Sequence, residues 1–122
     1  MEKIQWIEFQ GHKIILEDFS NIEPGEEFRN ALDKARAEIH SQPEKSVLAL
    51  FDATDARFDQ DSLSKMKDFV NSNTPYIQAA AVVGVKGLAQ VALMAVTRFS
   101  KRSFQTCETR EEAMAWLVNQ VK

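Results

Sequence analysis

Four aspartates lie close together in the middle of the chain, where oxygen ligands at short spacing could hold a divalent cation. They occupy the stretch from Asp52 to Asp61, with Asp55 and Asp59 between them. The spacing departs from the calcium-loop pattern, because Ala56 stands at a ligand position and no glycine follows it. Neither histidine lies nearby. The residues favour a structural use, in which Asp59 or Asp61 caps a helix and the others are solvated, and we predict no metal.

Two serines, Ser62 and Ser64, follow these aspartates at the expected start of a helix. A phosphate on either hydroxyl would meet the helix dipole and free backbone amides. An unmodified serine is also a favoured helix cap. The positions alone leave regulation and capping open as alternatives.

An apolar stretch from Leu88 to Phe99 carries more apolar side chains than one packing face needs. Leu93 and Met94 lie off the stripe that is expected to pack on a sheet. Cations flank this stretch, namely Lys86 before it and Arg98, Lys101 and Arg102 at its end. Cations suit a helix C-terminus, but they would also suit an acidic partner or an anionic headgroup beside an apolar pocket. We rank a protein partner or a homodimer contact above a ligand here.

Composition and charge exclude several other classes. The net charge of -3 gives no globally basic surface, so we expect no nucleic-acid partner. No stretch reaches the ~18 apolar residues of a membrane span, and no signal peptide is visible, so we expect a cytoplasmic protein without an integral membrane segment. The lone Cys107 is expected to be a packed side chain. The sequence has no Cys-His pair, Ser-His-Asp pattern or phosphate loop, and we predict neither an enzyme nor a cofactor.

The apolar patterns predict an α/β fold with strands and helices in alternation. The expected strands are Lys3–Phe9, His12–Phe19, Ser46–Phe51, Gln78–Val85 and Ser103–Glu108. The expected helices follow the Asn21–Gly25 breaker, surround Leu63–Val70, cover Leu88–Phe99, and begin at a Thr109–Glu112 capping box. We predict one domain over residues 1–122, with a single-layer, mixed, mainly parallel five-stranded sheet, an N-terminal β-hairpin and four helices.

A longer pattern of residues carries a family resemblance. It comprises Ser46-Val47-Leu48-Ala49-Leu50-Phe51-Asp52, Arg57-Phe58, Ala81-Val82-Val83-Gly84-Val85, Gly87-Leu88, Arg98-Phe99, Glu111-Glu112-Ala113 and Trp116-Leu117. With these landmarks the chain resembles the SpoIIAA-like branch of the STAS superfamily from about Gly11 to its end. The resemblance implies a phospho-switch module in which a partner kinase modifies a serine at a helix start. Ser62 takes that position, although Gln60-Asp61-Ser62-Leu63 replaces the Asp-Ser-Ser-Gly signature.

The function expected from the residues and the resemblance together is recognition rather than catalysis. It is a STAS-type regulatory module that binds a protein partner or a second copy of itself, with Ser62 as the candidate phosphate acceptor. The alternative is a carrier of a small hydrophobic ligand or lipid, since the fold is similar in outline to CRAL-TRIO domains. A closed cavity of ~300 Å³ or more would favour the carrier. The candidate interaction loop comprises Asp52, Asp55, Asp59, Asp61 and Ser64, and the candidate partner or ligand surface comprises Lys86, Leu93, Met94, Arg98 and Arg102.

Overall fold

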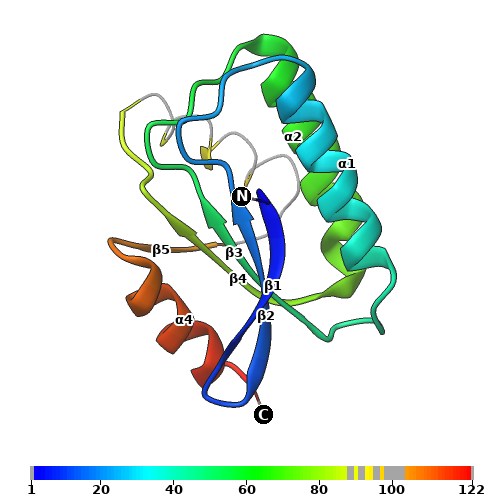
Figure 1. The fold of residues 1–122 in the computed structure, drawn as a ribbon, viewed down its shortest axis with the longest axis vertical. Coiled ribbons are helices and arrows are strands. Elements are labelled where there is room, and N and C mark those ends of the chain that lie inside the picture. Colours follow the sequence, from blue (N-terminus) through cyan, green and yellow to red (C-terminus); the bar gives the residue numbers. More distant parts are fainter. Residues whose placement is uncertain (1, 88–89, 91–92, 95–96, 98–103, 122) are drawn as a thin grey trace.

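The computed structural model of the chain, which describes residues 2–87, 90, 93–94, 97 and 104–121, is built on one five-stranded sheet (Figure 1). The strands are β1 (Ile4–Phe9), β2 (His12–Asp18), β3 (Val47–Asp52), β4 (Ile77–Val83) and β5 (Gln105–Cys107), and they are neighbours in that order. The β1–β2 pair is antiparallel, and the other three pairs are parallel. The predicted α/β class, the hairpin and the mainly parallel sheet are confirmed.

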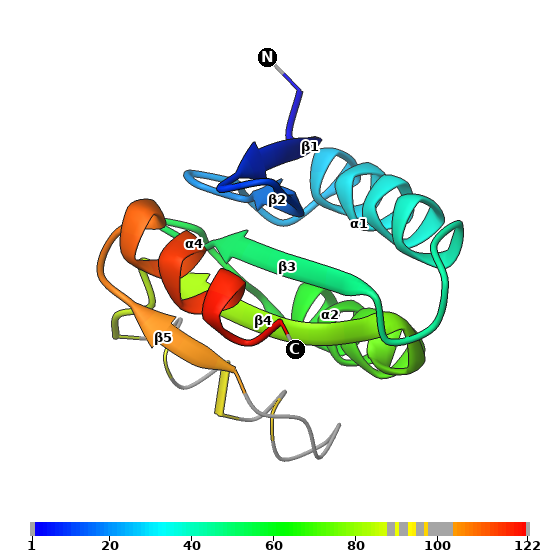
Figure 2. The ribbon, with the colours of Figure 1, turned by 90° about the horizontal axis from the view of Figure 1, so that it is seen from below.

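Within the part of the chain that the structure describes, three helices with defined bounds cover the two faces of this sheet (Figure 2). Helices α1 (Glu26–His40) and α2 (Gln60–Asn73) lie on one face, and α4 (Arg110–Asn119) lies on the other. A short 3-10 turn, η1 (Thr74–Tyr76), joins α2 to β4. The prediction of four helices is not confirmed, because the expected helix at 88–99 falls mostly outside the described residues. Within the described residues, none of the helices combines the length and the apolar character needed to cross a membrane.

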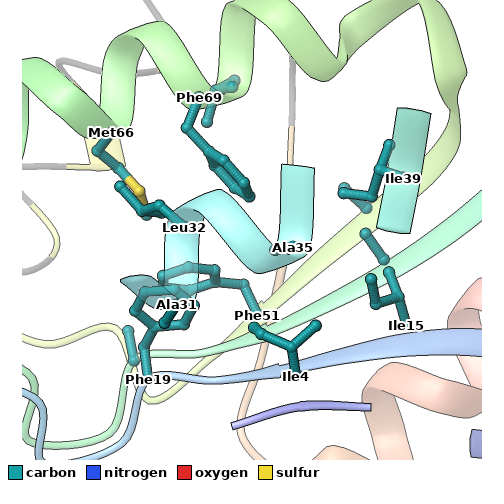
Figure 3. Packing of buried hydrophobic residues seen from close by; sticks show 14 of the residues in the cluster. Ile4, Ile15, Phe19, Ala31, Leu32, Ala35, Ile39, Phe51, Met66 and Phe69 are labelled. Carbon is teal, nitrogen blue, oxygen red and sulfur yellow. The ribbon is translucent and has the colours of Figure 1, made fainter. Parts of the chain in front are cut away.

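The continuous apolar run of β3 reflects this two-sided cover. Its six residues are all buried. Side chains alternate across a strand, so Ala49 and Phe51 join the cluster under α1 and α2, whereas Leu48 and Leu50 join the cluster under α4. Figure 3 shows the first cluster, in which side chains of both helices meet the sheet. The sequence prediction of a strand buried on both faces is therefore confirmed.

The parallel strands end together at one edge of the sheet, here called the carboxyl edge. Asp18, Asp52 and Val83 are register partners at the ends of β2, β3 and β4. Gly84 follows with a φ of +77°, so β4 ends two residues before the predicted Val85. A Cβ on Gly84 would lie 2.6 Å from the Cα of Thr54. The missing side chain allows the end of β4 to approach the loop after β3.

Candidate functional site

Two aspartates at the carboxyl edge form the same local turn. Asp18 Oδ1 accepts hydrogen bonds from the backbone N–H of Ser20 at 3.1 Å and from its hydroxyl at 2.5 Å. Asp52 Oδ1 accepts from the backbone N–H of Thr54 at 2.9 Å and from its hydroxyl at 2.6 Å. A side chain that bonds the backbone two residues later fixes the chain as it leaves a strand. The two turns therefore set the direction of the β2–α1 and β3–α2 loops.

Arg110, the first residue of α4, joins the two aspartates. Its Nε donates to Asp52 Oδ2 at 2.7 Å, and its Nη2 lies 3.2 Å from Asp18 Oδ1. The Asp52 side chain is only 7% exposed, so its contact with Arg110 is largely removed from water. Burial acts to raise the pKa of Asp18, but the hydrogen bonds from Ser20 and the charge of Arg110 outweigh it and hold that pKa below its ordinary value. Arg110 of α4 thus forms ion pairs with Asp18 and Asp52 of the sheet.

Backbone hydrogen bonds connect the loops that follow β2 and β3. The N–H of Phe19 donates to the carbonyl of Asp52 at 2.9 Å. The N–H of Asn21 donates to the carbonyl of Thr54 at 2.8 Å, and the N–H of Arg57 donates to the carbonyl of Ile22 at 2.9 Å. We call residues 19–25 and 53–59 the paired loops. They form a connected surface rather than two independent segments.

The paired loops expose charges of both signs. Asp55 is exposed in the left-handed region, with a φ of 55°. The Arg57 guanidinium lies 3.6 Å from Glu23, and their side chains are 78% and 71% exposed. An ion pair so open to water contributes little to folding. These charges therefore remain accessible to another molecule.

The start of α2 uses the predicted serine and aspartate as a capping box. The backbone N–H of Ser62 donates to Asp59 Oδ1 at 2.8 Å, and the backbone N–H of Asp59 donates to Ser62 Oγ at 2.7 Å. The first of these bonds is the main reason why the pKa of Asp59 lies below its ordinary value. Ser62 is only 2% exposed, and its hydroxyl also donates to the Asp59 carbonyl at 3.0 Å. Asp61 and Ser64 in the same turn are exposed.

The second predicted surface divides into an inward and an outward part. Leu93 is half-buried and packs against the core cluster under α1 and α2. Met94, the next residue, is 59% exposed. Lys86 is exposed, whereas Arg98 and Arg102 lie outside the described residues. The two apolar side chains that the sequence placed together therefore have different surroundings.

Leu93 borders an apolar cavity of about 60 Å³ between α2 and the sheet. The sequence did not reveal this cavity. Alanines of β3 and β4 line it on the sheet side, and the side of the sheet on which these alanines lie depends on the register of the two strands. Glu17 of β2, which is 3% exposed, is the acidic residue among the described lining residues. The described lining consists of Glu17, Ala49, Phe51, Ala53, Phe58, Leu63, Met66, Phe69, Val70, Ala80, Ala81, Val82, Val85, Leu93 and Phe104.

Two other groups bear on the chemistry of the chain. Among the described residues, no three histidine, cysteine, aspartate or glutamate side chains are grouped so as to hold a metal ion. Cys107 in β5 is buried, and burial together with the nearby charge of Glu112 raises the pKa of its thiol. This thiol is therefore held in its protonated, weakly nucleophilic form.

Comparisons of the chain with family models, with curated proteins and with solved structures gave no match. The fold defines the class, which is an α/β protein with a mixed five-stranded sheet. The resemblance to the SpoIIAA-like branch of the STAS superfamily stays a prediction from the residues.

Proposed function

We propose that the chain is a non-catalytic, STAS-like interaction module that recognises a protein partner through the paired loops. The supporting observation is that backbone hydrogen bonds join these two loops while their charged side chains reach solvent. A surface that is ordered before binding loses little conformational entropy when a partner docks. Glu23, Asp55 and Arg57 supply charges of both signs, which favours a partner with complementary charges.

Recognition also accounts for the use of the polar groups at the carboxyl edge. Asp52 is held by Arg110 and Thr54, and Asp59 and Ser62 cap α2. These groups are committed to holding the loops in place. The charges that remain exposed are suited to contact another surface.

Control by phosphate at Ser62, which the resemblance implies, would need the first turn of α2 to open. The hydroxyl of Ser62 is inside the capping box and is only 2% exposed. A kinase needs that hydroxyl in an accessible segment, and a phosphate placed there would displace Asp59 from its cap. Phosphorylation would then alter the shape of the paired loops at their junction with α2.

The alternative function, a carrier of a small hydrophobic ligand or lipid, has less support. The cavity of about 60 Å³ is well below the ~300 Å³ at the lower end of sites for drug-sized ligands. A long acyl chain does not fit in that space. The interaction module is therefore the preferred function.

Charge reversal on the paired loops tests the proposal. The tagged chain and its Glu23→Lys and Arg57→Glu variants are expressed in the native host, and bound proteins are identified by quantitative mass spectrometry. Glu44→Lys is the matched control, since Glu44 is exposed in the loop between α1 and β3. We expect a defined protein, or a second copy of the chain, to be retained by the wild type and the control and lost from both loop variants.

Two outcomes would count against the module. One is that no protein is retained by the wild type. The other is that all four forms retain the same proteins in the same amounts, because the paired loops would then play no part in binding. Circular dichroism of each variant checks that the fold is intact.

A further inference from the structure

Strand β1 lies at the outer edge of the sheet (Figure 2), where among the described residues β2 is its one strand neighbour. An edge strand presents backbone N–H and C=O groups that can pair with a strand of another molecule. Of the two edge strands, β1 has six residues and β5 has three. Proline, which would interrupt pairing, is absent from the sequence of β1. β1 is therefore the longer template for an added strand.

The pairing of β1 with β2 decides which of its backbone groups face the open edge. The N–H of Asp18 donates to the carbonyl of Lys3 at 2.7 Å, so Lys3 bonds toward β2. Positions that bond toward the partner strand alternate along an antiparallel strand. The next positions that bond toward β2 are Gln5, Ile7 and Phe9. The positions whose N–H and C=O groups point to the open edge are Ile4, Trp6 and Glu8.

Side chains of β1 also leave apolar surface in contact with water. Ile7 and Phe9 are half-buried and pack against the cluster under α4, the one helix with defined bounds on that face within the described residues. Trp6 is half-buried on the opposite face, beside the cluster under α1 and α2. A strand added at the edge would cover part of this surface, and removing apolar surface from water is favourable.

A second copy of β1 can complete this edge with matching groups. When two antiparallel strands are related by a two-fold axis, each residue lies opposite a residue that faces the same side of the sheet. With the axis at Trp6, the two Trp6 residues lie opposite each other, and Ile4 of one copy lies opposite Glu8 of the other. Every outward N–H and C=O group of β1 then has a partner.

The neighbouring registers are less favourable. Moving the axis one residue toward the N-terminus places Glu2 of one copy opposite Glu8 of the other, and like charges in directly opposite positions are destabilising. Moving it one residue toward the C-terminus places Ile4 opposite Gln10, which lies in the hairpin turn with a φ of 50°. Ile4 would then lose its partner in a strand. β1 is therefore complementary to itself in the register centred on Trp6.

We propose that the chain forms a homodimer in which the two β1 strands pair antiparallel about Trp6 and join the two sheets into one. Each copy contributes one short strand, so the interface is small and the dimer depends on protein concentration. This interface is separate from the paired loops. The Glu23→Lys and Arg57→Glu variants should therefore dimerise as the wild type does, whatever partner they retain or lose.

Sedimentation velocity and amide hydrogen exchange by NMR, each at about 50 µM and about 1 mM protein, test the dimer. We expect the dimer to be more populated at the higher concentration. The amides of Ile4, Trp6 and Glu8 should then exchange at least about threefold more slowly than at the lower concentration. The amides of Gln5 and Ile7 should be protected at both concentrations, because they bond to β2 within each copy.

A proline at position 8 separates the backbone contact from the side chain. Glu8→Pro removes an N–H that points to the open edge and leaves the bonds to β2, a position at which an edge strand tolerates proline. We expect this variant to be monomeric at both concentrations. Glu8→Ala is the matched control, since it removes the same exposed side chain but keeps the N–H, and it should dimerise as the wild type does.

Several results would overturn the inference. One is a wild type that stays monomeric at about 1 mM. Another is protection of the Ile4, Trp6 and Glu8 amides that does not change with concentration, or a dimer that protects other amides instead. Dimerisation of a folded Glu8→Pro variant at wild-type strength would also contradict the pairing. If circular dichroism shows that Glu8→Pro disturbs the fold, the exchange pattern of the wild type decides alone.

Discussion

Replacing Arg110 by methionine tests the ion pairs between α4 and the sheet. Methionine keeps an apolar stem but leaves Asp52, whose side chain is 7% exposed, without the guanidinium that now lies 2.7 Å away. Breaking a buried ion pair by removing one partner costs about 3 to 5 kcal/mol, and an exposed pair is worth about 0 to 1 kcal/mol. Because the Arg110 side chain is itself 39% exposed, we expect the free energy of unfolding to fall by about 2 kcal/mol.

Urea unfolding at neutral pH, followed by circular dichroism, measures this loss. Asp52→Asn removes the negative charge, so the Arg110→Met/Asp52→Asn double variant should lose less than the sum of the two single variants, by about 1 kcal/mol. Lys34→Met is the control, since it removes only the exposed pair with Glu2 and should leave the midpoint unchanged. A loss below about 0.5 kcal/mol for Arg110→Met, or additive effects in the cycle, would refute the reasoning.

The effect of Arg110→Met should also depend on pH through Asp18. The folded state holds the pKa of Asp18 below its unfolded value, partly through the charge of Arg110. Such a carboxylate stabilises the fold above its unfolded pKa of about 4, and this contribution is lost as the pH falls through the folded pKa. The difference in stability between wild type and Arg110→Met should therefore stay constant from neutral pH to about pH 4 and shrink below it. A difference that grows on acidification would contradict this assignment.

Two further predictions concern the loops and the start of α2. Gly84→Ala should lower the free energy of unfolding by at least about 2 kcal/mol, because the new Cβ would lie 2.6 Å from Thr54 Cα. Gly11 has a similar φ but open space around it, so Gly11→Ala should lower the free energy of unfolding by about 1 kcal/mol. Equal losses for the two variants in thermal unfolding would contradict the close approach. Ser62→Ala should lower the free energy of unfolding by about 1 kcal/mol, because it removes half of the capping box with Asp59. Ser62→Glu should lower it further, because the position is only 2% exposed. If urea unfolding finds Ser62→Glu as stable as wild type, the hydroxyl is accessible and the first turn of α2 opens readily.

The elements of the fold were predictable because their signals are local. Two apolar runs around Gly11 predicted the hairpin, and the apolar residues from Val47 to Phe51 predicted a strand covered on both faces. The helix cap at Thr109 was also predictable, because Glu112 follows three residues later. The Thr109 hydroxyl oxygen accepts a hydrogen bond from the backbone N–H of Glu112 at 3.1 Å. Strand order could not be read in this way, since it depends on which helices cross which face.

The site was predicted only in part, because its central interaction joins distant positions. Arg110 lies 58 residues from Asp52 in the chain, and no local pattern connects them. The Asp-x-Ser/Thr pattern after β2 and β3 could have indicated Asp18, since it repeats the turn made by Asp52. Leu93 was grouped with Met94 because both lie off one helical stripe, yet one lines the cavity and the other is exposed.

In open α/β sheets ligands usually bind beyond the carboxyl ends of the strands, but the polar groups there serve another purpose in this chain. Arg110 and the two loop turns occupy the ends of β2 and β3, and the apolar space lies on the sheet face under α2. Phe58 connects the two regions, because it lines the cavity and follows Arg57, whose N–H is bonded to the carbonyl of Ile22. Phe58 packs against the core cluster while Arg57 is bonded to the other loop, so core packing helps to hold the paired loops in place.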